Sequence, residues 1–156
     1  MEIRDLRDAP EFFALVADRI WNAWWRPGGA ALSHVEEALR AVVSAGLFPF
    51  TLVASEQGRF AGTVTAIERD IPARPDIGPC IAALWVEPEA RGQKAGRLMT
   101  KLAMERLRLA GYRSAYLGAR PALRSYYVAG GWTLCEEQVG SDGLDLFHIG
   151  LECAGD

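Results

Sequence analysis

Hydrophobic residues follow two different spacings along this chain. In its first part they recur every three or four positions, which is the spacing of the buried face of a helix. One such stripe consists of Phe13, Val16, Ala17, Ile20 and Trp24, and a second consists of Val35, Ala38, Leu39, Val42 and Val43. These stripes predict two helices, which follow a short strand over residues 2–6.

Polar residues and a glycine predict where these two helices begin and end. Asp8 stands three positions before Glu11, and Ser33 stands three positions before Glu36, which is the spacing of a capping box. Gly46 has the position of a helix C-terminal cap. We therefore expect the helices to start near Asp8 and Ser33, and the second helix to end at Gly46.

Beyond residue 50 the pattern changes to the short apolar runs of β-strands. Strands are predicted over residues 51–54, 61–67, 80–86 and 113–118, followed by a terminal hairpin over 132–139 and 144–151. A helix after Gly96 separates two of these strands, and a strand–helix–strand succession predicts a parallel pair. The fold class is therefore α/β (α+β) with a mixed sheet. No repeat and no long linker divides the chain, so a single domain is expected over residues 1–156.

Composition narrows the class of protein. Half of the residues (50%) are hydrophobic and 24% are charged, which is typical of a globular chain. The net charge of −3 argues against nucleic-acid binding, because such domains usually carry a basic face. No apolar run reaches the roughly 18 residues of a membrane span, and the N-terminus lacks the apolar core of a signal peptide. We expect a cytoplasmic protein that binds neither nucleic acid nor membrane.

The cysteine and histidine residues do not form a recognisable site. Cys80, Cys135 and Cys153 are widely spaced and odd in number, which predicts reduced thiols and leaves a catalytic cysteine open. His34 and His148 lie too far apart in sequence to suggest a metal site by spacing. We therefore expect no metal.

The most informative segment runs from Leu84 to Met99, where a buried strand passes through proline and glycine into a helix. Free N–H groups at the start of a helix bind anions, and glycines let a ligand approach the backbone. Arg91, Lys94 and Arg97 add positive charge within the same few residues. This combination predicts a phosphate or pyrophosphate site.

Two common phosphate motifs do not fit this segment. A Walker A loop needs G-x-x-x-x-G-K-[ST], but the interval from Gly92 to Gly96 is one residue too short and no Lys-Ser or Lys-Thr pair follows it. The dinucleotide pattern G-x-G-x-x-G is absent too. The run Arg91-Gly92-Gln93-Lys94-Ala95-Gly96 instead resembles the acetyl-coenzyme A pyrophosphate loop of GNAT-type N-acetyltransferases, R/Q-x-x-G-x-G/A. Lys94 stands at the first glycine of that pattern and can still present its N–H.

A second motif extends the resemblance over essentially the full chain. The run Tyr126-Tyr127-Val128-Ala129-Gly130-Gly131-Trp132 resembles the family's F/L-Y-x-x-x-G-F/W element. The resemblance implies a GNAT fold with a mixed six- to seven-stranded sheet, splayed at strands 4 and 5, and about four flanking helices. It implies acetyl transfer from acetyl-coenzyme A to a primary amine of a small molecule or peptide, by direct attack through a tetrahedral intermediate.

The resemblance also assigns cofactor-binding residues. The backbone amides from Gly92 to Arg97, which include Gln93, Lys94, Ala95 and Gly96, would bind the pyrophosphate beside Arg91. The pantetheine arm would pair with Leu84, Trp85 and Val86 as an added strand, and the backbone N–H of Val86 or of a neighbour on the same strand would stabilise the oxyanion. Arg120 stands where the family often has an asparagine, so its hydrogen bond to the cofactor is expected to differ.

Catalytic and substrate residues follow from the same resemblance. Tyr127 would be the general acid, because a phenol with a pKa of ~10 can protonate a leaving thiolate. Tyr126 and Trp132 are expected to pack in the protein. Glu68 would be the general base, usually through water, with Asp70 and Asp76 as the other candidates. Trp25 lies off the first apolar stripe and could face the substrate.

Three questions stay open from the residues. The acceptor amine has no sequence signature, and the chain could use a longer acyl group or a hydroxyl acceptor. A catalytically silent acyl-coenzyme A sensor would keep the loop without needing Tyr127 or Glu68. The sequence is compatible with a homodimer but does not determine the oligomeric state.

Overall fold

The computed structural model describes residues 1–151 and contains a mixed, seven-stranded sheet with the strand order β1-β2-β3-β4-β5-β7-β6. The strands are β1 (Glu2–Asp5), β2 (Phe50–Glu56), β3 (Arg59–Ile67), β4 (Cys80–Val86), β5 (Ser114–Ala119), β6 (Thr133–Val139) and β7 (Leu144–Gly150). The α-helices are α1 (Phe13–Ile20), α2 (Leu32–Ser44), α3 (Ala95–Leu109) and α4 (Arg124–Ala129). The predicted fold class is confirmed. Of the helices in the described part, none is long and apolar enough to cross a bilayer.

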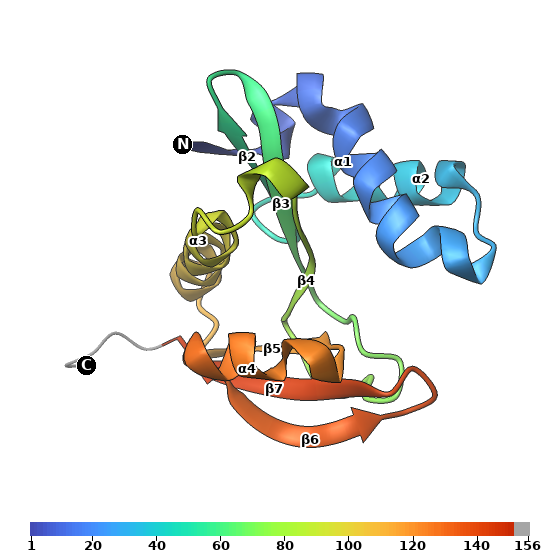
Figure 1. Cartoon of the computed structure of the whole chain (residues 1–156), viewed down its shortest axis with the longest axis vertical. Coiled ribbons are helices and arrows are strands. Elements are labelled where there is room, and N and C mark those ends of the chain that lie inside the picture. Colours follow the sequence, from blue (N-terminus) through green and yellow to red (C-terminus); the bar gives the residue numbers. More distant parts are fainter. Residues whose placement is uncertain (152–156) are drawn as a thin grey trace. The chain divides into compact units, whose positions relative to one another are not determined.

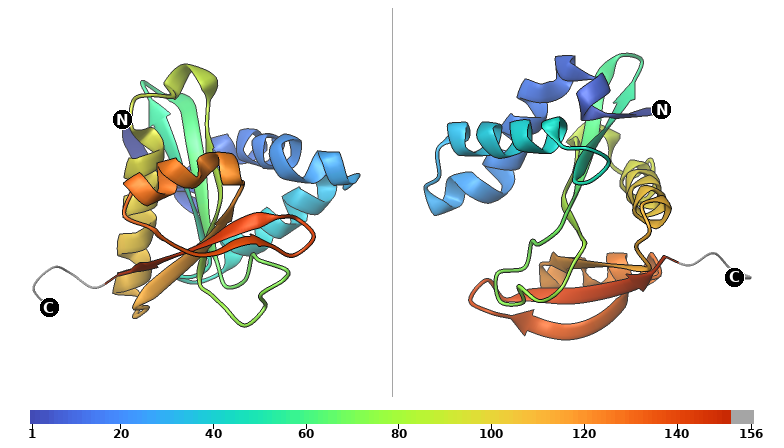
Figure 2. Two further views of the ribbon diagram at one scale, coloured as in Figure 1. Left: turned by 60° about the horizontal axis from the view of Figure 1, so that its bottom comes forward. Right: turned by 180° about the vertical axis from the view of Figure 1, so that it is seen from behind.

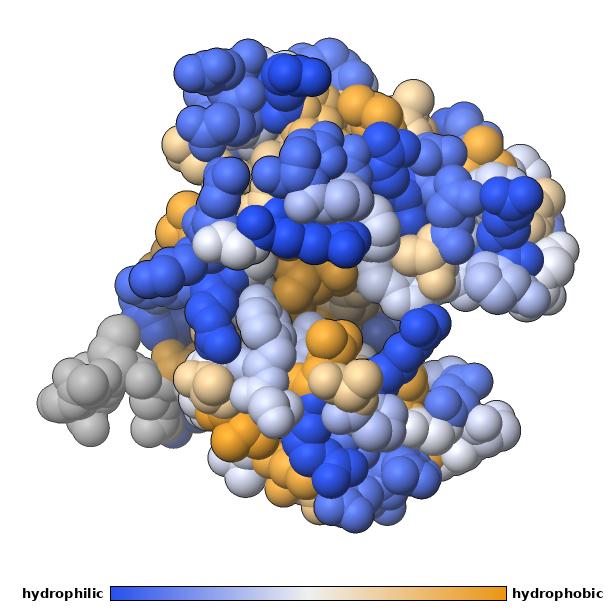
Figure 3. Space-filling view, in the orientation of Figure 1, coloured by the Kyte–Doolittle hydropathy of each residue, from blue (hydrophilic) through white to orange (hydrophobic). Residues whose placement is uncertain are grey.

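The contacts between residues divide the chain into two compact units. Unit 1 comprises Met1–Thr65 and Ala83–Ala103, and unit 2 comprises Ala66–Ala82 and the chain from Met104 onward. Strands β3 and β4 and helix α3 contribute residues to both units. On the face seen in Figure 3, hydrophilic side chains cover most of the surface and hydrophobic ones are scattered between them. The expected single domain over residues 1–156 stays a prediction.

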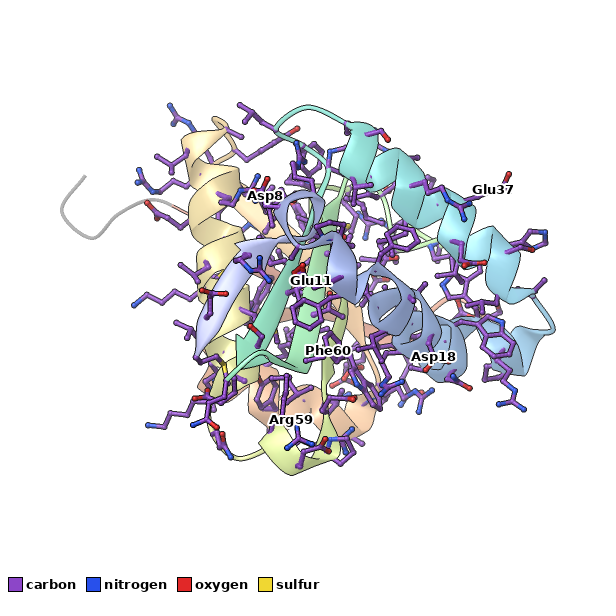
Figure 4. All side chains as sticks on the ribbon, turned by 90° about the horizontal axis from the view of Figure 1, so that it is seen from above. Asp8, Glu11, Asp18, Glu37, Arg59 and Phe60 are labelled. Carbon is purple, nitrogen blue, oxygen red and sulfur yellow. The ribbon has the colours of Figure 1, made fainter. Side chains whose placement is uncertain are left out.

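Unit 1 is built on strands β1 to β3. β1 pairs with β2 in the antiparallel direction, with Glu2 opposite Ser55. Helices α1 and α2 lie on one side of β2 and β3, and the first half of α3 lies on the other side (Figure 1). Phe60 packs beneath the start of α1, where its ring centroid lies 6.0 Å from that of Phe12 (Figure 4). The core between the two helices and the strands consists of Val16, Ala17, Ile20, Val35, Leu39 and Val53.

The predicted start of the first helix is wrong. Two short 3-10 helices, Leu6–Asp8 and Pro10–Phe12, precede α1, which begins at Phe13. Asp5 caps the first of them by accepting from the backbone N–H of Arg7. Glu11, labelled with Asp8 in Figure 4, accepts instead from Arg4 on β1. The acidic side chain needed for a capping box is therefore bound elsewhere.

The predicted ends of the second helix are also wrong. α2 begins at Leu32, before Ser33, and no side chain caps its N-terminus. At its other end Ala45 is extended, so Gly46 does not form a left-handed cap. The Arg7 guanidinium donates to the carbonyls of Ala45 and Gly46 at 3.1 and 2.7 Å. A distant arginine thus binds the carbonyls of the two residues that follow α2.

A π-helical turn over Trp21–Trp25 changes the phase of the first apolar stripe. A π-turn holds more residues than an α-turn, so side chains beyond it rotate away from the stripe. Trp24 is 43% exposed and Trp25 is 42% exposed, which means that Trp24 does not lie on the buried face. Trp21 donates its indole N–H to the Ala30 carbonyl at 2.8 Å and so ties the turn to the loop after it.

Unit 2 contains β5, β6 and β7 with α4. β5 and β6 each pair with β7 in the antiparallel direction, as predicted for the terminal hairpin. β4 joins β5 in parallel, with Cys80 opposite Tyr116, which confirms the predicted parallel pair. α4 covers one face of these strands (Figure 2). The ring centroid of Tyr127 on α4 lies 5.5 Å from that of Phe147 on β7. On the other face Ile71, Cys80 and Leu146 form a small core.

Candidate functional site

The connection from β4 to α3 in unit 1 has the backbone geometry of an anion-binding loop. After the 3-10 helix Pro88–Ala90, residues 91–94 form a turn that leads into α3 at Ala95. Gly92 has a φ of 82° and Lys94 a φ of 64°, so both take the left-handed conformation. Lys94 stands where the motif has a glycine, and it takes the backbone conformation that glycine adopts most readily. The first N–H groups of α3 have no partner within the helix and can bind an anion.

A glycine that sequence reading missed brings β4 and α3 close to β3. A Cβ on Gly62 would lie 2.6 Å from the Trp85 carbonyl oxygen and 2.8 Å from Cε of Met99. Met99 is fully buried on α3. Only a residue without a side chain can therefore occupy this position of β3. Ala83, which has a φ of 50°, interrupts the extended backbone of β4 just before the predicted pantetheine-binding residues.

The cationic side chains of the loop differ in their surroundings. Arg91 turns back onto β4, where its Nε donates to the Val86 carbonyl at 3.0 Å. Its guanidinium carbon lies 5.0 Å from the centroid of the Trp85 ring, which is cation–π distance. Lys94 and Arg97 are exposed. Arg91, predicted to lie beside the phosphates, thus contacts the strand that precedes the loop.

Glu87, which directly follows β4, is a buried carboxylate that sequence reading missed. Only 9% of its side chain is exposed. It accepts from Nε and Nη2 of Arg19 on α1 and from the indole N–H of Trp85 at 2.7 Å. The hydrogen bonds from Arg19, supported by Trp85, lower the pKa of the Glu87 carboxyl against the opposing effect of burial. Hydrogen-bond donors from two elements, α1 and β4, therefore stabilise the negative charge of the Glu87 carboxylate.

Tyr127 is the most buried of the predicted catalytic groups. It lies on α4 in unit 2 and is 9% exposed. Its ring contacts those of Tyr126 and Trp132 edge-to-face, with centroid distances of 5.0 and 6.4 Å. Burial, followed by the neighbouring Tyr126, raises the pKa of the Tyr127 hydroxyl to about 12. Trp132 is 4% exposed, as expected, but Tyr126 is 36% exposed and is not the packing residue of the pair.

An ion pair fastens α4 to β7 beside Tyr127. Nε and Nη2 of Arg124 donate to the two carboxylate oxygens of Asp145 at 2.8 and 3.0 Å. Asp145 is fully buried and also accepts from the backbone N–H of Gln138 at 3.2 Å. The Arg124 hydrogen bonds hold the pKa of the Asp145 carboxyl below its usual range. The helix that carries Tyr127 is thus anchored by a two-point hydrogen bond.

The three acidic candidates after β3 differ in their chemistry. The side chain of Glu68 is 69% exposed and lies 3.8 Å from Arg69. Asp76 forms a two-point ion pair with Arg74, which lowers the pKa of its carboxyl. Asp70 is exposed at the surface, but partial desolvation of its carboxyl by the surrounding protein raises the pKa of that carboxyl to about 6. The Asp70 carboxyl therefore has a pKa raised towards neutral pH, whereas that of Asp76 is lowered.

Other chemistry-bearing residues in unit 2 are less suited to catalysis. Burial raises the pKa of the Cys80 thiol to about 11, so this cysteine is a poor nucleophile at neutral pH. Cys135 is exposed and free, and Cys153 lies outside the described residues. Arg120 is exposed immediately before a 3-10 helix, Pro121–Leu123. Within residues 1–151 no three His, Cys, Asp or Glu side chains form a possible metal site.

A cavity of about 250 Å³ lies within unit 2, between the loop after β3 and the turn of the β6–β7 hairpin. None of its lining residues was predicted to belong to a site. They are Ile71, Pro72, Ala73, Val139, Gly140, Ser141, Asp142 and Leu144.

The predicted site residues therefore divide between the two units. Trp25, the pantetheine-binding residues of β4 and the anion loop belong to unit 1. The catalytic and acidic candidates Glu68, Asp70, Asp76 and Tyr127 belong to unit 2, together with Arg120, which was predicted to contact the cofactor. Most of the predicted cofactor-binding residues thus lie in unit 1, and the predicted acid and base candidates lie in unit 2.

Comparisons with known proteins agree with these features. The model of the acetyltransferase (GNAT) family matches residues 17–129. An aminoglycoside 6'-N-acetyltransferase solved with coenzyme A is similar over 100% of both chains, with 16% identity and a TM-score of 0.76. Aminoglycoside 6'-acetyltransferase type Ii covers 98% of this chain and 99% of its own, with 19% identity and a TM-score of 0.72. Ribosomal-protein-alanine N-acetyltransferase from Brucella melitensis covers 95% and 97%, with 22% identity and a TM-score of 0.68. A search of curated protein sequences finds no match.

Proposed function

Because the chain belongs to the acetyltransferase (GNAT) family, we propose that it transfers an acetyl group from acetyl-coenzyme A to the primary amine of a small molecule or peptide. The observation that carries this proposal is the loop before α3. Its left-handed residues, Gly92 and Lys94, lead directly into the N-terminus of α3, and this loop lies within the matched residues.

The loop fits the pyrophosphate of coenzyme A in its backbone and in its charge. The amides from Gly92 to Arg97 would bind the phosphate oxygens, and Lys94 and Arg97 add positive charge. Leu84, Trp85 and Val86 are half-buried on β4 and would pair with the pantetheine arm. When bound, acetyl-coenzyme A supplies an acetyl group activated as a thioester.

The amine must lose a proton before it can attack. A lysine-like ammonium has a pKa of ~10.4, so its neutral form at pH 7 is disfavoured by roughly 4.6 kcal/mol. Asp70 is the strongest candidate for the base, because a carboxyl whose pKa is about 6 is ionised at pH 7 yet is more basic than an ordinary aspartate. Glu68, which was the first choice from sequence, has a side chain that is 69% exposed, and Asp76 is held by Arg74.

The leaving thiolate must gain a proton. Tyr127 keeps its proton at neutral pH because its pKa is raised to about 12, and it can donate that proton as the thiolate leaves. Packing against Phe147 and Trp132 restricts the ring to one orientation. The exposed indole of Trp25 on the π-turn offers a flat surface that an acceptor could contact.

The acceptor can be identified by release of the coenzyme A thiol from acetyl-coenzyme A. The panel would contain an aminoglycoside, a peptide with an N-terminal alanine and a peptide with an internal lysine. We expect turnover with at least one amine. Measurable binding of coenzyme A without turnover on any amine would favour the silent sensor and would overturn this proposal.

The loop can be tested separately from turnover. Gly96→Glu adds bulk and negative charge at the start of α3, so we expect calorimetry to detect no binding of coenzyme A. Gly150→Glu is a matched control, because a Cβ on Gly150 meets no atom within 4 Å. The control should bind coenzyme A as the wild type does. An unchanged affinity of Gly96→Glu would show that the loop is not the binding site.

A further inference from the structure

The buried Glu87 carboxylate connects three parts of unit 1. Arg19 approaches it from α1 with Nε and Nη2, at distances of 2.8 to 3.1 Å. Trp85 approaches from β4 and donates its indole N–H to Oε2. A carboxylate removed from water needs such partners, and the planar guanidinium matches its two oxygens. Glu87 therefore fixes the orientation of the Trp85 side chain relative to α1.

The contacts continue from Trp85 to the loop. The Arg91 guanidinium lies over the Trp85 ring, at 5.0 Å from its centroid. Arg91 also donates its Nε to the Val86 carbonyl at 3.0 Å, so two contacts hold it against the end of β4. Its next neighbour in sequence is Gly92, the first left-handed residue of the loop. We call Arg19, Glu87, Trp85 and Arg91 the Glu87 brace.

We propose that Glu87 is a positioning residue for coenzyme A binding, which holds the loop of residues 92–97 in its binding conformation through Trp85 and Arg91. The proposal rests on the proposed function. Lys94 has a left-handed conformation that a residue with a Cβ avoids, so the loop needs support from its surroundings to keep it. A loop that is already ordered loses less conformational entropy when it binds its ligand. The brace acts on one end of this loop.

The brace gives Arg91 a task different from a direct phosphate contact. In a direct contact, the positive charge would matter most, and lysine could replace arginine. In the brace, the planar group matters, because it rests on the indole and donates from Nε to the Val86 carbonyl. The lysine ammonium has neither a planar group to rest on the indole nor a donor at the position of Nε. Arg91→Lys thus separates the two tasks at constant charge.

The central test measures coenzyme A affinity by calorimetry on the full chain. Glu87→Gln keeps the shape but cannot accept from all the donors, and we expect the dissociation constant for coenzyme A to rise by about tenfold, because the loop must then be ordered on binding. The Michaelis constant for acetyl-coenzyme A should rise likewise, with kcat within about threefold, because affinity alone is altered. A purely structural role would leave the affinity of the folded fraction unchanged.

Trp85→Phe tests the link between Glu87 and the loop if Glu87→Gln folds poorly. It keeps a ring beneath Arg91 and leaves the pair of Arg19 and Glu87 intact, but it removes the indole N–H. We expect a smaller loss of affinity, of about threefold, and no further loss when it is combined with Glu87→Gln, because both act through one contact. Full additivity of the two losses would overturn the proposal.

Glu105→Gln is the matched control for charge and residue type. Glu105 pairs with Arg108 at 2.6 Å on the exposed side of α3, and this pair does not belong to the brace. Its coenzyme A affinity should equal that of the wild type. Arg91→Lys should lose affinity by about as much as Glu87→Gln, with an unchanged dependence on salt.

The outcomes separate the brace from the function it serves. If wild-type protein binds no coenzyme A, the proposed function fails. If the wild type binds while folded Glu87→Gln, Trp85→Phe and Arg91→Lys all bind equally well, the brace proposal alone is overturned.

Discussion

Each unit of this protein contains a carboxylate buried against an arginine from a helix, but the two carboxylates connect to different things. In unit 1, Glu87 joins Arg19 of α1 to Trp85 of β4. In unit 2, Asp145 joins Arg124 of α4 to the backbone of Gln138 within the β6–β7 hairpin. The first pair therefore leads to the anion loop, and the second holds the helix that carries Tyr127.

The surrounding ionisable groups differ in the same way. The groups proposed to bind the phosphates in unit 1 are the N–H groups at the start of α3 and the cations of the loop, and these need not change protonation state. In unit 2, the surroundings raise the pKa of Asp70 to about 6 and that of Tyr127 to about 12. Desolvation of this kind is how enzymes adjust groups that exchange protons. Substitutions in unit 1 should therefore alter affinity, and those in unit 2 should alter rate and pH dependence.

The largest effect on rate is expected from Tyr127→Phe. The substitution removes the hydroxyl but keeps the ring that packs on Phe147, so the fold should remain. We expect kcat to fall by about 10²- to 10³-fold, as for the loss of a general acid. The coenzyme A affinity, measured by calorimetry, should stay within about twofold of wild type. A parallel loss of affinity would contradict the division of tasks between the units.

The next largest effect distinguishes Asp70 from Glu68. Asp70→Asn should lower kcat/KM by about 10- to 100-fold, whereas Glu68→Gln, at a side chain that is 69% exposed, should change it by less than about threefold. The rate of the wild type should rise with pH through about 6, as the Asp70 carboxyl loses its proton. This acid limb should be missing in Asp70→Asn. A limb that persists there and disappears in Glu68→Gln would make Glu68 the base.

The same pKa shift of Asp70 has a consequence for stability. The folded chain binds the Asp70 proton more tightly than the unfolded chain, in which the carboxyl has its ordinary pKa of 3.8. The contribution of Asp70 to the free energy of unfolding therefore falls as pH rises from 3.8 towards about 6. Asp70→Asn should remove this decrease. Urea unfolding of both proteins across that interval measures the difference.

A smaller effect is expected from Asp145→Asn, which weakens the anchor of α4. Loosening of Tyr127 should lower kcat by about three- to tenfold, because small displacements of a catalytic group reduce the rate. The pKa of Asp145 is lowered in the folded state, so its stabilising effect is present above the ordinary aspartate pKa and is lost as pH falls. Asp145→Asn should therefore unfold at lower temperature at pH 7 and approach wild type in acid. If Asp145→Asn lost coenzyme A affinity but kept its kcat, the assignment of affinity to unit 1 and of rate to unit 2 would be wrong.

Local patterns predicted much of the fold, because their causes lie within a few residues. The apolar run of β4 and the glycines and cations after it identified the strand, the loop and α3 together. The predicted start near Asp8 failed, because Glu11 pairs with Arg4 and short 3-10 helices replace the capping box. The predicted burial of Trp24 failed because a π-turn has no clear sequence signal. In these cases a side-chain contact or a change of helix type overrode the spacing.

The site was less predictable than the fold, because its supporting contacts join distant parts of the chain. Arg19 and Glu87 are far apart in sequence, and neither belongs to a recognised motif. Gly62 is one glycine among many until Trp85 and Met99 are placed beside it. The local motif thus indicated where an anion would bind, whereas the residues that hold the loop in position could be found only from the structure.

The smallest effect is expected from Lys94→Gly. This substitution tests whether Lys94, which replaces a glycine of the motif, contributes to phosphate binding through its backbone N–H or through its charge. Lys94 has a φ of 64°, which costs about 1 kcal/mol for a residue with a Cβ. Glycine removes this strain but also makes the unfolded chain more flexible, so we expect a net stabilisation of about 0.5 kcal/mol in urea unfolding. Lys101→Gly, on the exposed side of α3, is the matched control and should destabilise by about 1 kcal/mol.

Affinity gives the second readout of Lys94→Gly. If the Lys94 N–H binds the phosphate, calorimetry should find a coenzyme A affinity within about threefold of wild type, because glycine presents the same N–H. If the ammonium group is the ligand, the affinity should fall by more than about tenfold, and its dependence on salt should weaken. The second result would mean that lysine is retained at this strained position for its charge. Unit 1 would then bind the anion with a side chain placed by a strained backbone, as well as with helix N–H groups.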